Sequence, residues 1–409
     1  MATIITNIRR LCGILPEGTQ QLSGAQMGSL SSIENAWLIA DDEVIKDFGS
    51  MNALPDYAGM TVIDATNRLV LPAFVDSHTH LVFAAPREQE FVQRIKGATY
   101  ADIAAAGGGI LNSAKRLAAM DEEELFDQSL ERLHAVMAQG TGCIEIKSGY
   151  GLNTEAELKM LRVIRRLKET APIPVFASFL AAHAFPDPYR EDREGYIRLI
   201  IDEMLPRVAG EGLADFMDVF CEQGFFSVDQ TNRLLEAGLK HGLQPKIHAN
   251  QLHNSGGVQA GIAHGALSVD HLECVGDAEI EALKNSSTIP TLLPGAAFFL
   301  GMHYQPARAM IDAGLPVCLA TDYNPGSCPS GSMPLLTTLA CTQMKMTPEE
   351  AINACTINGA AALGYGDLTG SITRGKWATL MMTKPMDNVA MIPYDFGNNP
   401  IERLILVGD

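Results

Sequence analysis

The chain has 409 residues, of which 47% are hydrophobic, so it is long enough to form one large domain and a smaller one. Its formal net charge of −18 argues against nucleic acids and anionic membranes as partners, because both repel an acidic protein. The apolar stretches are too short or too interrupted by proline and glycine to span a bilayer. Eight cysteines without close pairing predict reduced thiols and a cytoplasmic location, since a chain of this size needs no disulfide framework.

The two ends of the chain have β character. Residues 36–49 predict a β-hairpin around an Asp-Asp turn, and the pattern of short strands and turns extends over the first 66 residues. Strand-like sequence returns near the C-terminus. We therefore expect residues 1–66 and 366–409 to form a small β-sandwich together, beside a larger domain at residues 67–365.

From about residue 70 onward, strands and helices alternate. Eight apolar segments have strand character, at residues 71–76, 142–147, 175–180, 215–220, 245–248, 267–270, 288–293 and 317–321. Helical patterns separate most of them. Alternation of this kind predicts a parallel sheet, and eight such units predict a closed (β/α)8 TIM barrel of the α/β class.

The intervening helices carry end signals. Residues 121–138 are periodic in leucine and valine and stop at a glycine. A capping box at residues 154–157 predicts the start of a second helix, and Ser227 predicts the start of a third. Residues 347–350 combine a capping box with a proline at the first helical position.

The most informative motif is the pair His78 and His80, directly after the first barrel strand. Alternate side chains of a strand share a face, so the two rings are expected to point the same way. Two imidazoles side by side can hold one divalent metal. Further along the chain, His248 and Asp322 also stand at strand ends.

Barrel active sites lie at the C-terminal ends of the strands, so the polar residues at these ends are the candidates. They are His78 and His80; Glu145, Lys147, Ser148, Gly149 and Tyr150; His183; Cys221 and Glu222; His248, Asn250 and Gln251; Asp270, His271 and Glu273; Asp322, Asn324, Gly326 and Ser327. A single histidine in this position is as consistent with a hydrogen-bonded core residue as with a ligand. Several histidines at one end of a barrel favour a metal centre.

We expect His78, His80, His248 and Asp322 to be the metal ligands, with water in an open position. A metal of this kind lowers the pKa of the water from about 15.7 toward about 7. Asp322 is then expected to act as ligand and proton acceptor together. His271 is expected to stay off the metal and to stabilise negative charge on a carbonyl oxygen. Asp322 and His271 are thus the predicted catalytic residues.

The fourth strand lacks a residue that could bridge two metals, which favours a single metal. A two-metal site of this kind usually needs a bridging ligand there, such as a carbamylated lysine, and this chain has Cys221 and Glu222 instead. Lys147 lies on the second strand, where a buried, paired lysine is the favoured interpretation.

The run from Val70 to His80 resembles the signature of the amidohydrolase superfamily, and so does the order of the ligands. Within that superfamily the chain resembles the imidazolonepropionase family over nearly its whole length. The resemblance rests on Arg87, Gly97-Ala-Thr-Tyr100, Gly107-Gly-Gly-Ile, Glu145-Ile-Lys-Ser-Gly-Tyr150-Gly-Leu, Ala181-Ala-His183-Ala, His248-Ala-Asn-Gln251 and Ala320-Thr-Asp322-Tyr-Asn324-Pro-Gly326-Ser327. It implies hydrolytic ring opening of 4-imidazolone-5-propanoate to N-formimidoyl-L-glutamate in histidine degradation, with one zinc or iron ion and a homodimer.

The resemblance also assigns residues. It implies metal binding by the four residues named above, and contacts with a small anionic substrate by Arg87, Tyr100, Tyr150, His183, Asn324, Gly326 and Ser327. Arg87 suits the substrate carboxylate, although a surface salt bridge is the alternative, and both tyrosines are alternatively core aromatics. Many relatives carry an acid where this chain has Gln251, which can bind substrate but cannot shuttle protons. Proton transfer is therefore expected from His271 and Asp322.

Two other functions stay open at this point. One is an aromatic-ring deaminase of the guanine or cytosine type, which needs an acid near the fifth-strand histidine, so Gln251 counts against it. The other is a non-catalytic scaffold on the same fold. A scaffold would be expected to lose ligands, whereas all four are present.

Overall fold

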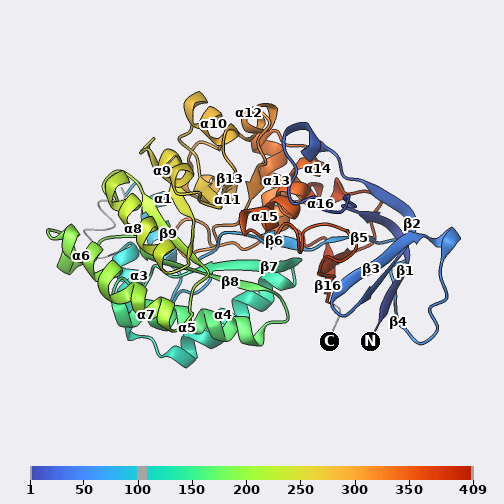
Figure 1. The fold of residues 1–409 in the computed structure, drawn as a ribbon, viewed down its shortest axis with the longest axis horizontal. Coiled ribbons are helices and arrows are strands. Elements are labelled where there is room, and N and C mark those ends of the chain that lie inside the picture. Colours follow the sequence, from blue (N-terminus) through green and yellow to red (C-terminus); the bar gives the residue numbers. More distant parts are fainter. Residues whose placement is uncertain (1, 99–107, 407–409) are drawn as a thin grey trace.

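The computed structural model describes residues 2–98 and 108–406. In this part of the chain, eight parallel strands follow one another around a barrel, and their order in the sheet is their order in the sequence (Figure 1). They are β6 (Phe74–Asp76), β7 (Thr141–Lys147), β8 (Val175–Ala182), β9 (Phe216–Cys221), β11 (Ile247–Ala249), β12 (Ser268–His271), β13 (Ile289–Leu292) and β14 (Cys318–Leu319), with β10 (Gln244–Pro245) beside β9. The predicted (β/α)8 barrel is confirmed.

The last strand meets the first through their C-terminal loops. The backbone N–H of Asp322 donates to the carbonyl of His78 at 3.0 Å, and the N–H of His80 donates to the carbonyl of Tyr323 at 2.9 Å. The Thr321 hydroxyl donates to Asp76 at 2.7 Å. These bonds hold the histidine pair of the first strand directly beside the aspartate of the eighth.

Among the described residues, strands from both ends of the chain form a second, seven-stranded sheet beside the barrel (Figure 1). It contains β1 (Thr3–Cys12), β2 (Ser32–Asp41), β3 (Val44–Ser50), β4 (Thr61–Asp64), β5 (Leu69–Pro72), β15 (Leu380–Thr383) and β16 (Ile401–Ile405). Strands β2 and β3 pair antiparallel, as the hairpin prediction requires. The buried side chains of Ile5, Leu11, Leu38, Leu380 and Ile405 belong to one apolar cluster, which fixes the two ends of the chain to each other.

The first predicted barrel strand, residues 71–76, is two strands in the structure. The N–H of Ala73 donates to the carbonyl of Thr379, directly before β15, and the N–H of the next residue, Phe74, donates to the carbonyl of Gly140, directly before β7. Neighbouring residues therefore bond to different sheets. The chain passes at this point from β5 of the terminal sheet into β6 of the barrel. The segment that leads to the histidine pair is therefore attached to both sheets.

Helices cover the outside of the barrel. They are α1 (Glu88–Ile95), α3 (Ile110–Ala119), α4 (Glu122–Met137), α5 (Thr154–Thr170), α6 (Arg193–Leu199), α7 (Leu205–Gly210), α8 (Val228–Lys240), α9 (Gly257–Ala263), α10 (Asp277–Lys284), α11 (Pro294–Leu300), α12 (Ala307–Asp312), α13 (Met333–Met344), α14 (Pro348–Ala354), α15 (Ile357–Ala362) and α16 (Met391–Tyr394). None of those described is long and apolar enough to cross a membrane. All eight cysteines lie in the described part and are free thiols.

The predicted helix starts at Asp121, Ser227 and Thr347 are confirmed, because each of these side chains accepts from a backbone N–H of the first turn. The capping box predicted at residues 154–157 is wrong. The cap of α5 is Asn153, whose side chain accepts from the Ala156 N–H at 3.0 Å. The Glu157 carboxylate, predicted to close that box, is buried and turns toward the loop that follows β7.

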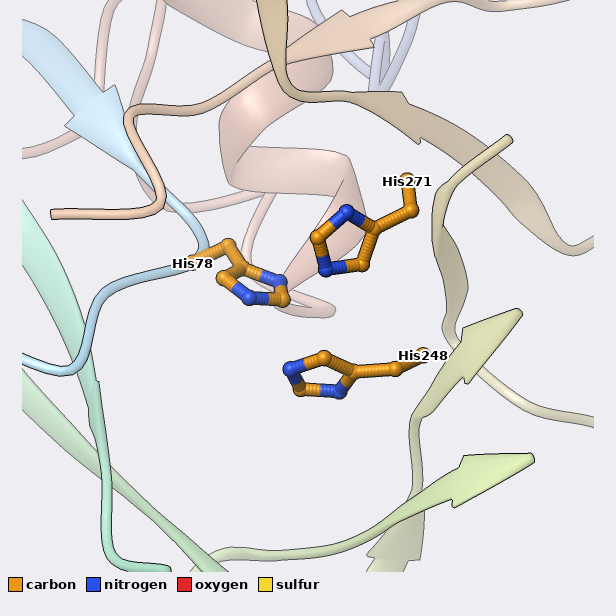
Figure 2. A group of neighbouring side chains, drawn as sticks. All are labelled: His78, His248 and His271. Carbon is orange, nitrogen blue, oxygen red and sulfur yellow. The ribbon is translucent and has the colours of Figure 1, made fainter. Parts of the chain in front are cut away.

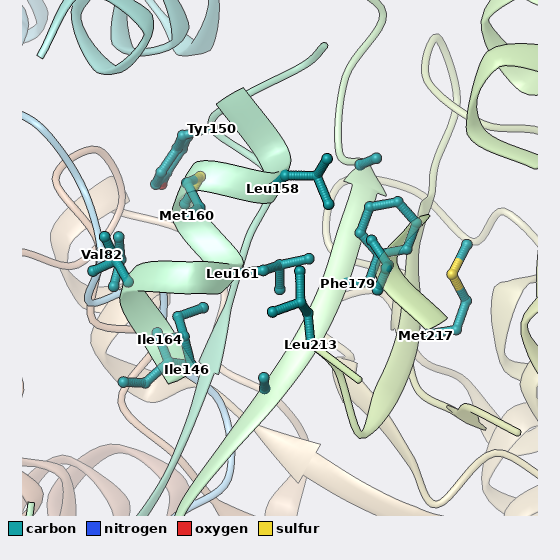
Figure 3. Packing of buried hydrophobic residues seen from close by; sticks show 14 of the residues in the cluster. Val82, Ile146, Tyr150, Leu158, Met160, Leu161, Ile164, Phe179, Leu213 and Met217 are labelled. Carbon is teal, nitrogen blue, oxygen red and sulfur yellow. The ribbon is translucent and has the colours of Figure 1, made fainter. Parts of the chain in front are cut away.

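Helix α5 packs its apolar face against β7 and β8. Figure 3 shows Leu158, Leu161 and Ile164 of the helix beside Ile146 and Phe179 of the strands. Burying a leucine or isoleucine side chain of this kind contributes about 1.5–3 kcal/mol. The layer holds the strands rigidly, and their C-terminal ends carry the site.

Candidate active site

Five side chains from four strand ends converge at one end of the barrel. They are His78 and His80 after β6, His248 on β11, His271 at the end of β12 and Asp322 after β14, and all five are buried. Figure 2 shows the rings of His78, His248 and His271 facing a common space. The Oδ1 atom of Asp322 lies 3.6 Å from Nε2 of both His78 and His80, and the Nε2 atoms of His80 and His248 are 3.4 Å apart. All predicted ligands are therefore neighbours.

The surroundings of His78 and His80 favour the neutral form, which metal ligands need. Burial, with the nearby Lys147 charge, holds the pKa of His78 well below its ordinary value. Burial, with the neighbouring His183, does the same to the pKa of His80. A neutral imidazole offers a lone pair to a metal. The Nε2 atom of His78 is buried and has no hydrogen-bond partner among the described residues, which fits a divalent ion at this point.

Two carboxylates fix the outer sides of these rings. Nδ1 of His78 lies 2.6 Å from Asp270, and Nδ1 of His248 lies 3.0 Å from Asp218. Such partners set the tautomer of a ligand histidine, because the Nδ1–H donates outward and leaves Nε2 free. The donor set and its orientation suit a metal such as zinc.

The ligand atoms fall into two overlapping groups. His78, His80 and Asp322 offer atoms that lie within 4.8 Å of one another, and so do His78, His248 and His271. His271 thus stands closer to the centre than the sequence indicated. Its Nδ1 atom lies 3.6 Å from the buried Glu273, and Gln305 donates to the same carboxylate oxygen at 3.0 Å.

The electrostatic setting of His271 differs from that of the other rings. Burial opposes its charged form, but the carboxylates of Glu273, Asp322 and Asp270 together outweigh burial and raise the pKa of His271 above its ordinary value. The backbone here is strained, with φ of +87° at His271 and +55° at Asp322. Residues other than glycine rarely adopt such angles, and they cluster at functional sites.

The loop after β7 brings Tyr150 against the histidines. Its ring centroid is 5.8 Å from that of His80, and the His183 ring stacks on His80 at 5.1 Å. The buried Glu157 holds this loop, since it accepts from the N–H groups of Gly149, Gly151 and Leu152 at 3.1, 2.7 and 2.9 Å. Tyr150 and His183, the two substrate contacts predicted in this region, thus lie beside the proposed ligand His80.

Arg87 lies at the start of α1, close to the loop after β14. It forms an ion pair with Glu90 at 2.7 Å, and its side chain is only 15% exposed, so it is not a surface salt bridge. A Cβ atom at Gly326 would lie 2.4 Å from the Arg87 guanidinium, so a side chain there would displace the guanidinium from its present position. Burial raises the pKa of Tyr150, and the Arg87 charge opposes that rise, so the guanidinium is near enough to act electrostatically on the Tyr150 hydroxyl.

The predicted contacts Asn324 and Ser327 shape the loop that carries Asp322. The Asn324 side chain donates to the Asp322 carbonyl at 2.7 Å and accepts from the N–H groups of Gly326 and Ser327 at 2.8 and 2.7 Å. The Ser327 hydroxyl donates to Oδ2 of Asp322 at 3.0 Å. This bond turns Oδ1 of Asp322 toward the histidines.

Of the two remaining predicted substrate contacts, the structure describes Gln251 but not Tyr100. Gln251 is half-buried in the loop after β11, and the Glu222 carboxylate holds that loop through the N–H groups of Leu252 and His253 at 2.9 and 3.2 Å. Tyr100 lies outside the described residues.

Sequence reasoning missed Asp218 and Lys246 and gave no role to Glu273. Lys147 was expected to be a paired lysine, and it is: it lies 2.6 Å from Glu145 and 2.8 Å from Asp218. Burial disfavours its ammonium form, but the surrounding carboxylates outweigh burial and raise the pKa of Lys147. The sequence feature that could have identified Asp218 is its position as a charged residue in the middle of the apolar strand β9.

The barrel with its strand-end histidines defines an amidohydrolase-type fold. The model of the amidohydrolase family matches residues 227–409. A guanine deaminase of E. coli has a TM-score of 0.75 at 14% identity, over 99% of this chain and 97% of that one. An adenosine deaminase of Xanthomonas campestris with bound zinc has a TM-score of 0.69 at 16% identity, over 100% and 92%. These similarities show the fold.

Closer relatives narrow the family. A protein of Flavobacterium johnsoniae named imidazolonepropionase is 54% identical over 100% of this chain and 99% of its own length. Proteins of the same name from Christiangramia forsetii and Geobacillus kaustophilus are 52% and 45% identical, over 100% and 92% of this chain and 99% and 88% of theirs. The chain belongs to the imidazolonepropionase family.

Proposed function

We propose that the protein hydrolyses 4-imidazolone-5-propanoate to N-formimidoyl-L-glutamate, a step of histidine degradation. The observation that carries the proposal is the cluster of His78, His80, His248 and Asp322 at one end of the barrel, in which the buried Nε2 atom of His78 has no hydrogen-bond partner among the described residues. The chain is also 54% identical to a named imidazolonepropionase. His78, His80, His248 and Asp322 would hold one divalent ion, zinc or iron, which would lower the pKa of a bound water and so provide the nucleophile for the ring carbonyl.

Asp322 and His271 have different roles in the proposed reaction. Asp322 accepts the proton of the attacking water, because Ser327 holds its Oδ2 atom and leaves Oδ1 at the histidines. His271 donates a hydrogen bond to the carbonyl oxygen as negative charge develops there. The carbon–nitrogen bond of the cyclic amide then breaks, and the leaving nitrogen takes the proton that Asp322 accepted.

The propanoate group needs a local cation in a protein of net charge −18. Arg87 is our proposed partner for it. The substrate carboxylate either replaces Glu90 at the Arg87 guanidinium or shares the guanidinium with it. Either is possible because the substrate and Glu90 present carboxylates of the same geometry. The remaining proposed contacts are Tyr100, Tyr150, His183, Gln251, Asn324, Gly326 and Ser327.

The direct test uses freshly generated 4-imidazolone-5-propanoate, whose ultraviolet absorbance decays as the ring opens. We expect metal-loaded protein to accelerate this decay far beyond the spontaneous rate, with N-formimidoyl-glutamate as the product by mass spectrometry. Guanine and cytosine, assayed for ammonia release, are the controls for the deaminase alternative, which the relatives do not favour. No acceleration with fully metal-loaded protein would contradict the proposal.

We expect one tightly bound transition metal per chain. The reason is that β9 offers no bridging lysine, and the nearby Lys147 ammonium is already held by Glu145 and Asp218. Elemental analysis of protein purified without added metal measures the ratio and identifies zinc or iron. Two tightly held ions per chain would contradict a mononuclear centre.

Arg87→Ala is expected to weaken substrate binding more than it slows the chemical step. A lost charge-assisted hydrogen bond costs roughly 1.5–3 kcal/mol, which is about 10- to 150-fold in affinity. Steady-state kinetics should show a raised KM, and Arg87→Lys should recover only part of the loss because a point charge cannot replace the guanidinium fork. An unchanged kcat/KM would exclude Arg87 from the carboxylate site.

We further propose that the protein is a cytoplasmic homodimer, with no nucleic-acid or membrane partner. The eight free thiols support a reducing compartment. Sedimentation velocity at micromolar concentration distinguishes dimer from monomer.

A further inference from the structure

A cluster of charged side chains lies buried beneath the histidines. It consists of Glu145 and Lys147 on β7, Asp218 on β9, Lys246 between β10 and β11, and Asp270 on β12, and each is 0% exposed. We refer to these five residues as the buried charge cluster. Its three carboxylates and two ammonium groups come from four segments of the barrel. Burying charges is costly unless each is paired, so such a cluster needs a reason to persist.

Every charge in the cluster is paired. Lys147 lies 2.6 Å from Glu145, 2.8 Å from Asp218 and 3.8 Å from Asp270. Lys246 lies 2.9 Å from the other oxygen of Glu145 and 4.0 Å from Asp270. Lys147 therefore joins Glu145 to Asp218, whereas Asp270 lies farther from both ammonium groups and accepts from the Ser268 hydroxyl at 2.5 Å. Carboxylates held in this way have little freedom to move.

The two aspartates are also the groups that contact the proposed ligands. Asp270 lies 2.6 Å from Nδ1 of His78, and Asp218 lies 3.0 Å from Nδ1 of His248. Lys147 therefore spans the two carboxylates behind two different ligand rings. Lys246 adds a second tie, because its ammonium donates to the carbonyl of Ser77, the residue before His78, at 2.9 Å.

We propose that the buried charge cluster positions the metal centre: Asp270 and Asp218 orient His78 and His248, Lys147 holds Asp218, and both lysines balance the charge of Asp270. Asp218, Asp270, Lys147 and Lys246 are then positioning residues. This role rests on the metal site of the proposed function. The formal charge of the cluster is −1, which also favours a cation above it. Its expected consequence is tight metal binding.

The test compares metal affinity in the full-length protein after metal removal. Zn²⁺ is titrated in competition with a chromophoric chelator for the wild type, Asp270→Asn, Asp218→Asn and Lys147→Met. Each variant is expected to bind Zn²⁺ about 10- to 100-fold more weakly, the usual effect of losing a partner behind a metal ligand. The matched control is Glu350→Gln, another buried carboxylate paired with a cation, Arg308 at 2.9 Å, which touches no ligand histidine. It should bind Zn²⁺ as the wild type does.

A second measurement separates positioning from mere stability. The visible absorption of the Co²⁺-loaded protein reports ligand geometry, and we expect it to change in Asp270→Asn and Asp218→Asn but not in the control. If these variants keep the wild-type Zn²⁺ affinity and Co²⁺ spectrum, the positioning role is wrong. Failure of the wild type itself to bind Zn²⁺ or Co²⁺ would instead contradict the proposed function.

Single variants leave one buried charge unpaired and can fail to fold. The double variant Lys147→Met with Asp218→Asn removes one charge of each sign, so the formal charge of the cluster stays at −1. We expect it to fold, by circular dichroism, and to bind Zn²⁺ more weakly than the wild type. If it does not fold either, the cluster is part of the structural core and the proposal is overturned.

Discussion

Asp322→Ala is expected to lose both its metal and its turnover. The Oδ1 atom of Asp322 lies 3.6 Å from Nε2 of His78 and of His80, so its removal deletes one proposed ligand of the set. It also deletes the proposed proton acceptor, which by itself contributes about 10²–10⁴-fold to a rate. Elemental analysis and the ring-opening assay on the same preparation measure both effects.

Ser327→Ala is the graded comparison for this variant. It removes only the hydroxyl that donates to Oδ2 of Asp322 at 3.0 Å and leaves the carboxylate in the site. We expect it to keep its metal and to slow turnover far less than Asp322→Ala. An Asp322→Ala protein with full metal content and residual activity close to that of Ser327→Ala would show that Asp322 is neither a ligand nor the proton acceptor.

His271→Ala is expected to keep its metal and its fold but to lose kcat. Removing one preorganised donor to a developing oxyanion typically lowers kcat about 10²–10³-fold. KM should change little, because the lost interaction strengthens only in the transition state. Kinetics together with metal content on the same sample decide the result.

The geometry also allows His271 to be a metal ligand. Its ligand atom lies within 4.8 Å of those of His78 and His248, so the ring is close enough to bind a shared ion. A His271→Ala protein that emerges metal-free would make His271 a ligand and end the proposed division of roles. Glu273→Gln keeps the ring and removes the charge beside Nδ1, so we expect a smaller loss of kcat with unchanged metal content.

The sequence by itself determined the barrel and the ends at which its chemistry lies. The strands are short apolar segments with clear limits, and β7 and β8 lie within two residues of their predicted bounds. In a parallel barrel all C-terminal strand ends meet at one face, so His78, His248 and Asp322 had to be neighbours once the strands were recognised. That inference needs only local pattern and a general rule of topology.

The tertiary structure alone decided the partners of buried charges and the path of the first strand. Glu157 fits a local capping pattern, yet its carboxylate serves the loop of Gly149 and Gly151, because a buried acid bonds to whatever N–H groups the fold brings to it. Lys147 and Asp218 are 71 residues apart and 2.8 Å from each other. Sequence periodicity reports which face of an element is buried, but the partner of a buried charge comes from another strand, and only packing selects it.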